Sequence, residues 1–153
     1  MSPQDVTALF SKVSDSLRAI AAGPYVDAVA RATAVLDEAL TSGHKLLVFG
    51  NGGSAADAQH IAAELVGRFL RERPAMSAIA LGTNHAFLTA WANDADYSDI
   101  FAREIEGLGR PGDVAWGIST SGNSPNVVNG LRRARELGLT TIALTGTGGG
   151  AAG

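Results

Sequence analysis

A dense run of hydroxyl side chains precedes a segment with helical periodicity. It reads Ser119-Thr120-Ser121-Gly122-Asn123-Ser124 and is followed by Pro125, which suits the first position of a helix. A helix N-terminus offers free backbone N–H groups and partial positive charge. Because the run contains no lysine or arginine, we expect hydroxyls and N–H groups to hold a phosphate here. A polar turn without a ligand is the alternative, and the missing Gly-x-x-x-x-Gly-Lys spacing excludes a Walker loop.

A second turn suited to chemistry lies at Asn51-Gly52-Gly53-Ser54, between an apolar segment and a helical one. Two glycines allow a tight turn and a close approach of the backbone to a ligand. Ser54 is a natural N-cap, and Asp57 follows three residues later, which is the capping-box spacing. The pattern therefore predicts a helix that starts after Ser54, with capping alone as the simpler role of both side chains.

His60 and Glu64 are four residues apart on that predicted helix and so project from one face. An imidazole nitrogen and a carboxylate oxygen in this arrangement make half of a zinc site. A helix-surface pair is the alternative. However, the small and apolar neighbours of the pair predict a largely buried helix, on which two ionisable groups need a reason.

Other polar residues allow more than one role. Asn93-Asp94 follows a predicted short helix, where it either forms a turn or contributes to the site. His85 either caps that helix or lines the site, and both roles stay open. His44 precedes the first strand, at the opposite edge of the sheet, and we expect it to be structural or solvated.

The elements that position these residues alternate between strands and helices. Short apolar runs predict strands at 45–50, 75–81, 113–118 and 140–145, and helical patterns predict helices at 55–69, 86–92, 98–108 and 126–137. This alternation predicts an α/β fold, a doubly wound, flavodoxin-like three-layer sandwich with a parallel sheet. Ligands bind beyond the carboxyl ends of such strands, which is where both turns fall.

Two amphipathic helices precede the first strand and form an N-terminal hairpin over residues 1–43. The first ends before Gly23, and the second begins near Pro24 and stops at Gly43. The first helix has one apolar stripe, made of Val6, Phe10, Val13, Leu17 and Ile20. In the second helix we expect the inward-facing residues to be Val26, Val29, Thr33, Leu36 and Leu40. Because so much apolar surface exceeds what a small sheet needs for cover, we expect part of it to be buried against another subunit.

Composition narrows the class of protein. The 153 residues are 46% hydrophobic, which favours one domain with a real core. A net charge of -3 makes nucleic acid an unsuitable direct ligand, and the absence of cysteine excludes thiolate chemistry and disulfides. Neither a signal peptide nor a membrane span is predicted, so we expect a cytoplasmic protein.

Four motifs in register resemble the phosphoheptose isomerase family, whose members have a sugar isomerase (SIS) domain. They are Gly-Asn-Gly-Gly-Ser-Ala-Ala-Asp-Ala-Gln-His at 50–60, Glu64, Asn93-Asp94, and Gly-Ile-Ser-Thr-Ser-Gly-Asn-Ser at 117–124. Each motif is weak alone, whereas the four in the right order are specific. The resemblance implies an isomerase that converts sedoheptulose 7-phosphate to D-glycero-D-manno-heptose 7-phosphate through an enediol, toward the heptose of lipopolysaccharide or related glycans.

The resemblance also implies a role for each matching residue. The sugar would contact Asn51, Gly52, Gly53, Ser54, Asn93 and Asp94, and the 7-phosphate would contact Ser119, Thr120, Ser121 and Ser124. Zinc would bind His60 and Glu64, and Glu64 would also move the proton between C1 and C2. Similar proteins are homotetramers.

The sequence departs from the family pattern at its end. Members of the family continue past the position of Gly150 with a strand and a long helix that bring a Gln and a His to the zinc and acid–base set. We therefore expect residues 44–153 to be an α/β core that lacks its C-terminal strand and helix. A non-catalytic SIS protein, either phosphosugar-binding or associated with a replication initiator, is the main alternative, and the presence of both His60 and Glu64 favours the enzyme.

Overall fold

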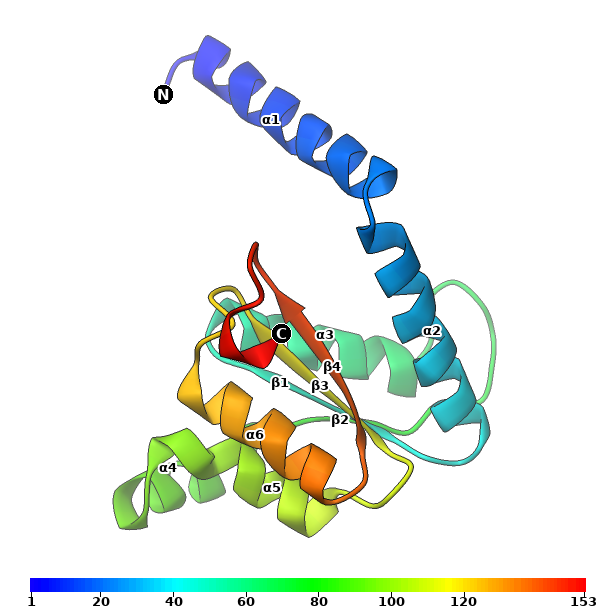
Figure 1. Ribbon diagram of the computed structural model, residues 1–153, viewed down its shortest axis with the longest axis vertical. Helices are drawn as coiled ribbons and strands as arrows, with labels where there is room; N and C mark the ends of the chain where they lie inside the picture. The colour runs from blue at the N-terminus through cyan, green and yellow to red at the C-terminus, as the bar shows by residue number, and fades with distance from the viewer. The chain divides into compact units, whose positions relative to one another are not determined.

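The computed structural model describes residues 1–153, in two compact units, Met1–Ala34 and Val35–Gly153. No helix is both long and apolar enough to span a bilayer. The elements, labelled in Figure 1, are α1 (Pro3–Ala22), α2 (Tyr25–Thr41), β1 (Leu46–Gly50), α3 (Gly53–Val66), β2 (Ala78–Ala80), α4 (His85–Asp94), η1 (Tyr97–Asp99), α5 (Ile100–Leu108), β3 (Val114–Ser119), α6 (Pro125–Glu136), β4 (Thr140–Thr145) and η2 (Gly150–Ala152).

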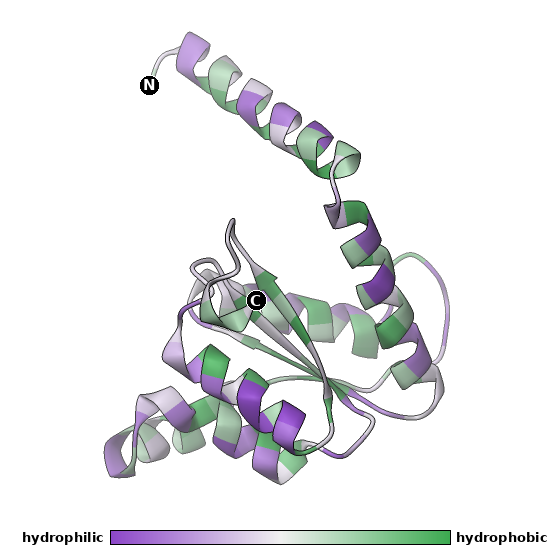
Figure 2. Cartoon of the chain, viewed as in Figure 1, coloured by the Kyte–Doolittle hydropathy of each residue, from purple (hydrophilic) through white to green (hydrophobic).

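The first unit is helical, as predicted. A capping box between Ser2 and Asp5 starts α1, with Pro3 at its first position, and Gly23 ends it. Apolar and polar residues alternate along α1 in Figure 2, as an amphipathic helix requires. The apolar side chains are exposed within the chain: Val6, Leu9, Phe10, Val13, Leu17, Ile20, Tyr25, Val26 and Val29.

The inward orientation predicted for the second helix holds only for its last turns. Val26, Val29 and Thr33 are exposed, whereas residues from Val35 onward pack on the sheet, with Ala39 buried. Periodicity identifies an apolar face but not what covers it.

The second unit is built on a parallel sheet, which confirms the predicted α/β class. Its strand order is β2-β1-β3-β4, with Leu46 level with Ala78 on one side and Val114 on the other. The predicted strand 75–81 is shorter than expected, at 78–80, because the N–H of Met76 donates to the carbonyl of Leu65 at the end of α3 instead of entering the sheet.

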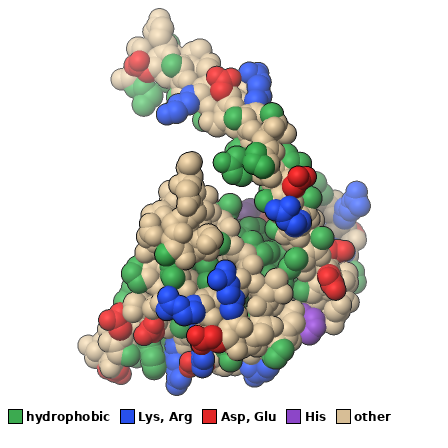
Figure 3. Space-filling model, viewed as in Figure 1, with side chains coloured by type: hydrophobic (Ala, Val, Ile, Leu, Met, Phe, Trp, Pro, Cys, Tyr) green, Lys and Arg blue, Asp and Glu red, His purple; other side chains and the backbone are tan.

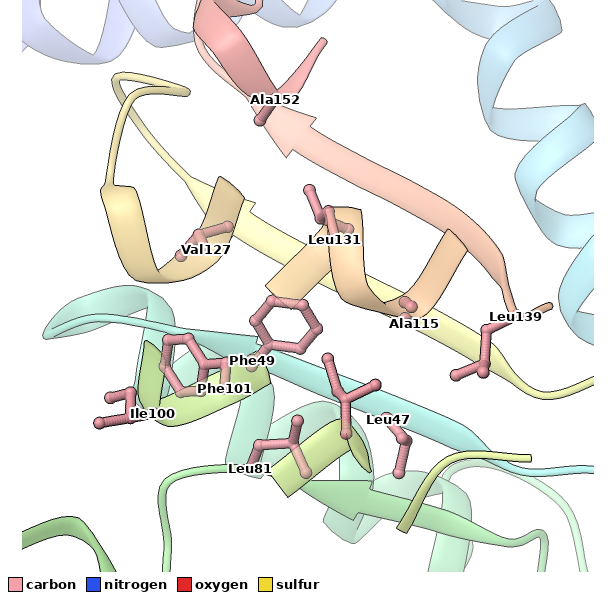
Figure 4. Close-up of a cluster of buried hydrophobic side chains, with 12 residues drawn as sticks. Leu47, Phe49, Leu81, Ile100, Phe101, Ala115, Val127, Leu131, Leu139 and Ala152 are labelled. Atoms are coloured by element: carbon pink, nitrogen blue, oxygen red, sulfur yellow. The ribbon is translucent and has the colours of Figure 1, made fainter. Parts of the chain in front are cut away.

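Helices cover both faces of the sheet (Figure 1), so each face has its own core. On one side, α5 and α6 bury the cluster drawn in Figure 4, where the rings of Phe49 and Phe101 pack at an interplanar angle of 40° with centroids 5.0 Å apart. Gly130 lets α6 approach closely, since a Cβ there would lie 2.9 Å from the ring of Phe49. On the other side, α3 and the last turns of α2 pack on β1, β2 and β3.

A buried carboxylate joins β1 to β3 at the amino end of the sheet. Asp113 accepts hydrogen bonds from the backbone N–H groups of Lys45 (3.0 Å) and Arg110 (2.8 Å) and from Lys45 Nζ (2.6 Å). Burial by itself would raise the pKa of Asp113, but these hydrogen bonds and the charge of Lys45 outweigh it and lower the pKa below its ordinary value. His44 Nδ1 lies 3.8 Å from this carboxylate and the His44 side chain is 40% exposed, in agreement with the expectation that it is structural or solvated.

Candidate functional site

A cavity of about 220 Å³ opens at the carboxyl ends of β1 and β3. This is the edge of a parallel sheet at which ligands bind. Its lining consists of Asn51, Ser54, Ile118, Ser119, Thr120, Ser121 and Ser124. The structure therefore brings together the four predicted phosphate-binding hydroxyls and two residues of the glycine turn.

The hydroxyl loop is held in shape largely by its own hydrogen bonds. Ser119 is only 4% exposed, and its Oγ lies 3.1 Å from Oγ of Ser124. Oγ of Ser121 accepts from the N–H of Asn123, which leaves the hydroxyl hydrogen of Ser121 free to donate. Ser124 is the N-cap of α6, yet its side chain makes no capping bond. The hydroxyl of Ser124 therefore does not cap α6, and that of Ser121 keeps a hydrogen to donate.

The glycine-rich residues after β4 support this loop from outside, a role that the sequence did not indicate. The N–H of Gly146 donates to Thr120 O and the N–H of Ala152 donates to Gly122 O, each at 3.0 Å. Gly122 has a left-handed φ of 66°, and a Cβ there would collide with the carbonyl of Gly149. Ala152 is buried beside Val127 and Leu131 in the core of Figure 4.

The glycine turn differs from its prediction at the start of α3. The helix begins at Gly53, with Gly52 as N-cap at φ 54°, and no side chain caps it. Because Gly52 O accepts from the N–H groups of Ala55 and Ala56, the backbone closes the first turn without Ser54. The predicted capping box of Ser54 and Asp57 is wrong: Ser54 lines the cavity and Asp57 is exposed.

Asn51 connects the two loops. Its side chain exchanges two hydrogen bonds with that of Asn126, at 2.9 Å and 2.8 Å, and its Oδ1 also accepts from the hydroxyl of Tyr97 at 3.3 Å. Asn126 is 2% exposed at the start of α6. Sequence reasoning missed both partners because one follows the serine run by two residues and the other is 46 residues away from Asn51.

His60 and Glu64 lie on one face of α3, as predicted, with Nε2 3.8 Å from Oε1. They continue an outer stripe of α3 that starts at Gly53 and passes through Asp57, whereas Ser54 begins the stripe that faces the sheet. The side chain of His60 is 75% exposed and that of Glu64 35%, and neither lines the cavity. The expectation of a largely buried helix is therefore wrong for this face of α3.

The remaining predicted residues lie outside the cavity lining. Asn93 and Asp94 form the last two residues of α4, not a turn beyond it, and are exposed, with Asn93 Nδ2 2.8 Å from Asp94 Oδ1. Tyr97, three residues later, reaches Asn51, so this segment is tied to the site. His85 is the exposed first residue of α4, and Asn84 caps that helix instead.

The electrostatics of the cavity suit an anion bound by neutral donors. No lysine or arginine lines it, and on the face drawn in Figure 3 the surface of the loops after β3 and β4 is tan and green rather than blue or red. The N-terminus of the twelve-residue α6 adds partial positive charge. Such a site can bind a phosphoryl group and leave the rest of a ligand to the glycine turn.

Comparison with known proteins agrees with this geometry. The SIS domain family matches residues 8–146, so the chain belongs to the SIS domain family. The curated relatives include the phosphoheptose isomerases of Bradyrhizobium sp. (strain ORS 278), 56% identical over 86% of the chain, and of Aquifex aeolicus, 56% identical over 82%. The chain spans 67% and 66% of the lengths of these relatives, and 53% of the one from Desulfovibrio desulfuricans.

Solved structures give the same assignment. The phosphoheptose isomerase structure from Neisseria gonorrhoeae superposes with a TM-score of 0.87 at 39% identity and covers 99% of this chain and 79% of its own. The phosphoheptose isomerase structure from Francisella tularensis superposes with a TM-score of 0.90 at 36% identity and covers 99% of this chain and 80% of its own. Within the SIS family, the sequence and fold place the chain among the phosphoheptose isomerases. None of these relatives supports the alternative of a non-catalytic SIS protein.

Proposed function

We propose that this protein is an aldose–ketose isomerase that converts sedoheptulose 7-phosphate to D-glycero-D-manno-heptose 7-phosphate, in the supply of heptose for lipopolysaccharide or related glycans. The observation that carries the proposal is the uncharged cavity of hydroxyls at the N-terminus of α6, with the glycine turn beside it. It suits a sugar whose phosphate is bound at one end. The names of the relatives, at 50–60% identity, support the choice of a heptose.

The base in this proposal is Glu64. Moving a carbonyl between adjacent carbons passes through an enediol, so a base must take a proton from one carbon and return it to the next. Glu64 is a partly exposed carboxylate on the stripe of α3 that begins at Gly53 in the glycine turn. Ser119, Thr120, Ser121 and Ser124 would hold the 7-phosphate, while Asn51, Gly52, Gly53, Ser54, Asn93 and Asp94 would contact the sugar.

His60 and Glu64 also fit two positions of a zinc site. Two donors bound to one zinc ion at about 2.0–2.2 Å lie within roughly 4 Å of each other, and Nε2 and Oε1 are 3.8 Å apart. No group of three His, Cys, Asp or Glu side chains is placed to hold a metal, so in this proposal the other ligands come from outside residues 1–153 or from another subunit. When bound, zinc would polarise the substrate oxygens as a Lewis acid.

The proposal includes a cytoplasmic homotetramer. Its support is the exposed apolar stripe of α1 and the start of α2, which is far more apolar surface than isolated exposed residues would give. A further subunit would also shield the outer stripe of α3, where His60 is open to solvent.

The proposed chemistry is tested with the full-length protein, sedoheptulose 7-phosphate and Glu64→Gln. We expect the wild type to form the aldose phosphate, detected by NMR, and Glu64→Gln to lower kcat by about a hundred-fold or more because the base is lost. Binding of the sugar phosphate should remain measurable. The control is Asp37→Asn, an exposed carboxylate on α2 without an ion pair, which should keep full activity.

Two outcomes contradict the proposal in different ways. Full turnover by Glu64→Gln would remove Glu64 from the mechanism while leaving the isomerase in place. Binding of the sugar phosphate by the wild type without any turnover would instead favour a non-catalytic SIS protein.

A further inference from the structure

The amide pair between Asn51 and Asn126 joins the two loops that line the cavity. Asn51 follows β1, whereas Asn126 lies in the first turn of α6, after the hydroxyl loop. Each side chain donates one N–H to the oxygen of the other, at 2.9 Å and 2.8 Å, which closes a ring of two amides. Asn126 is 2% exposed, while Asn51 borders the cavity. Only Asn51 can therefore contact a ligand in the cavity, and Asn126 can affect that ligand only through Asn51.

A backbone donor fixes which way both amides point. The N–H of Val127 is among the first N–H groups of α6, which have no partner within the helix, and it donates to Oδ1 of Asn126 at 3.0 Å. A backbone N–H cannot accept, so Oδ1 rather than Nδ2 of Asn126 must occupy that position. The remaining orientation follows: Asn126 Nδ2 faces Asn51 Oδ1, and Asn51 Nδ2 faces Asn126 Oδ1. The hydroxyl of Tyr97 agrees with this, since it can donate to Asn51 Oδ1.

The hydrogen-bonding capacity of Asn51 is nearly exhausted by these contacts. Its Oδ1 accepts from Asn126 and from Tyr97, which fills both acceptor positions. Its Nδ2 carries two hydrogens, of which the one on the same side as Oδ1 is used in the amide ring. The other hydrogen, on the opposite side, has no partner in the chain. Asn51 thus has one group left for a ligand, and that group is a donor.

We propose that Asn126 is a positioning residue that locks the amide of Asn51 so that it presents an N–H donor, and not a carbonyl, to an acceptor oxygen of the sugar phosphate. This inference rests on the proposed function, because it takes the occupant of the cavity to be a sugar phosphate. Asn51 would then bind only a ligand oxygen that accepts a hydrogen bond, such as the oxygen of a sugar carbonyl or hydroxyl.

A merely structural role for Asn126 makes a different prediction. If Asn126 only held the start of α6, its loss would disturb the hydroxyl loop and weaken every phosphorylated ligand equally. If it acts through Asn51, its loss should weaken the sugar part of the interaction and spare the phosphate. Inorganic phosphate and sedoheptulose 7-phosphate therefore separate the two roles.

The test is Asn126→Asp in the full-length protein. The carboxylate keeps the size of the side chain and still accepts from Val127, but both of its oxygens are acceptors. In either orientation of the Asn51 amide, Oδ1 of Asn51 then faces a carboxylate oxygen and is repelled, so the ring opens and the amide of Asn51 is no longer held in one orientation. The new charge repels the phosphate of both ligands alike, so we expect the Kd for sedoheptulose 7-phosphate to rise about tenfold more than the Kd for inorganic phosphate, the value of one hydrogen bond. Tyr97→Phe, an exposed position where folding is not at risk, should raise the sugar phosphate Kd by about two- to threefold.

NMR of the side-chain amides supplies a readout that does not depend on affinity. In the wild type, sedoheptulose 7-phosphate should shift the Asn51 amide proton opposite Oδ1 and leave the other proton, bonded to Asn126, nearly unchanged. Equal shifts of both protons, an unchanged sugar phosphate Kd in Asn126→Asp, or equal weakening of both ligands would overturn the inference. If the wild type binds no sugar phosphate at all, the proposed function is wrong, and so is the role of Asn51 as a hydrogen-bond donor to the sugar. The NMR spectrum of the free protein would still show whether Asn51 and Asn126 are hydrogen-bonded.

Discussion

Removing two hydroxyls from the loop after β3 tests whether that loop holds phosphate. The change is Ser121→Ala with Ser124→Ala, because the hydroxyl hydrogen of Ser121 is free and Ser124 makes no capping bond. A hydrogen bond to a charged group contributes about 1.5–3 kcal/mol. Taking the lower value for two bonds, because the loop is partly exposed, gives a loss of about 3 kcal/mol, or roughly a hundred-fold in Kd.

The assay is calorimetric titration of the variant with sedoheptulose 7-phosphate and, separately, with unphosphorylated sedoheptulose. We expect only the phosphorylated sugar to lose affinity. The matched control is Ser42→Ala with Ser77→Ala, two exposed serines whose hydroxyls make no hydrogen bond. Equal weakening of both sugars would refute the reasoning, since it would mean that the loop recognises the sugar or supports the fold instead of the phosphate.

Two further predictions concern the scaffold. Asp113→Asn should lower the free energy of unfolding at pH 7 by about 3 kcal/mol, because it uncouples Lys45 and removes the charge from three short hydrogen bonds. The pKa of Asp113 is lowered in the folded chain, so its contribution is complete above the ordinary pKa of a carboxyl and is lost as the pH falls through the folded value. The difference in free energy of unfolding between the wild type and Asp113→Asn should therefore be smaller at pH 3 than at pH 7 in denaturation curves. Phe10→Ser with Leu17→Ser should yield a smaller species than the wild type in light scattering, and a monomeric wild type would contradict a tetramer built on this stripe.

The sequence predicted the sheet and the hydroxyl loop well because both depend on local patterns. Apolar runs such as Leu46–Gly50 are buried on both faces, and the helix that follows Ser124 starts where Pro125 requires. The start of α3 was wrong because the capping-box pattern cannot reveal that the backbone of Gly52 closes the first turn by itself.

The partners of Asn51 could not be predicted for a different reason. Asn126 is 75 residues from Asn51, and their pairing depends on how closely β1 and β3 end beside each other. That approach is set by Gly50, where a Cβ would lie 2.7 Å from Ile118 O. Similarly, the alanines around His60 fit a buried or an exposed helix face equally well, so only the packing decides that His60 faces solvent.

The separation between the hydroxyl cavity and Glu64 is compatible with one linear substrate. Six carbon–carbon bonds of roughly 1.5 Å each join C1 to C7, so an extended heptose spans roughly 8 Å before its phosphate is counted. Glu64 lies ten residues from Ser54 on α3, or roughly 15 Å along the helix axis. Its Oε1, however, is 3.8 Å from Nε2 of His60, which is six residues, or roughly 9 Å along the axis, from Ser54. With its phosphate among the hydroxyls, the sugar would reach along α3 with its first two carbons farthest from the cavity. In the proposed function, the base and the metal ligands would therefore lie beside the cavity, not in its lining.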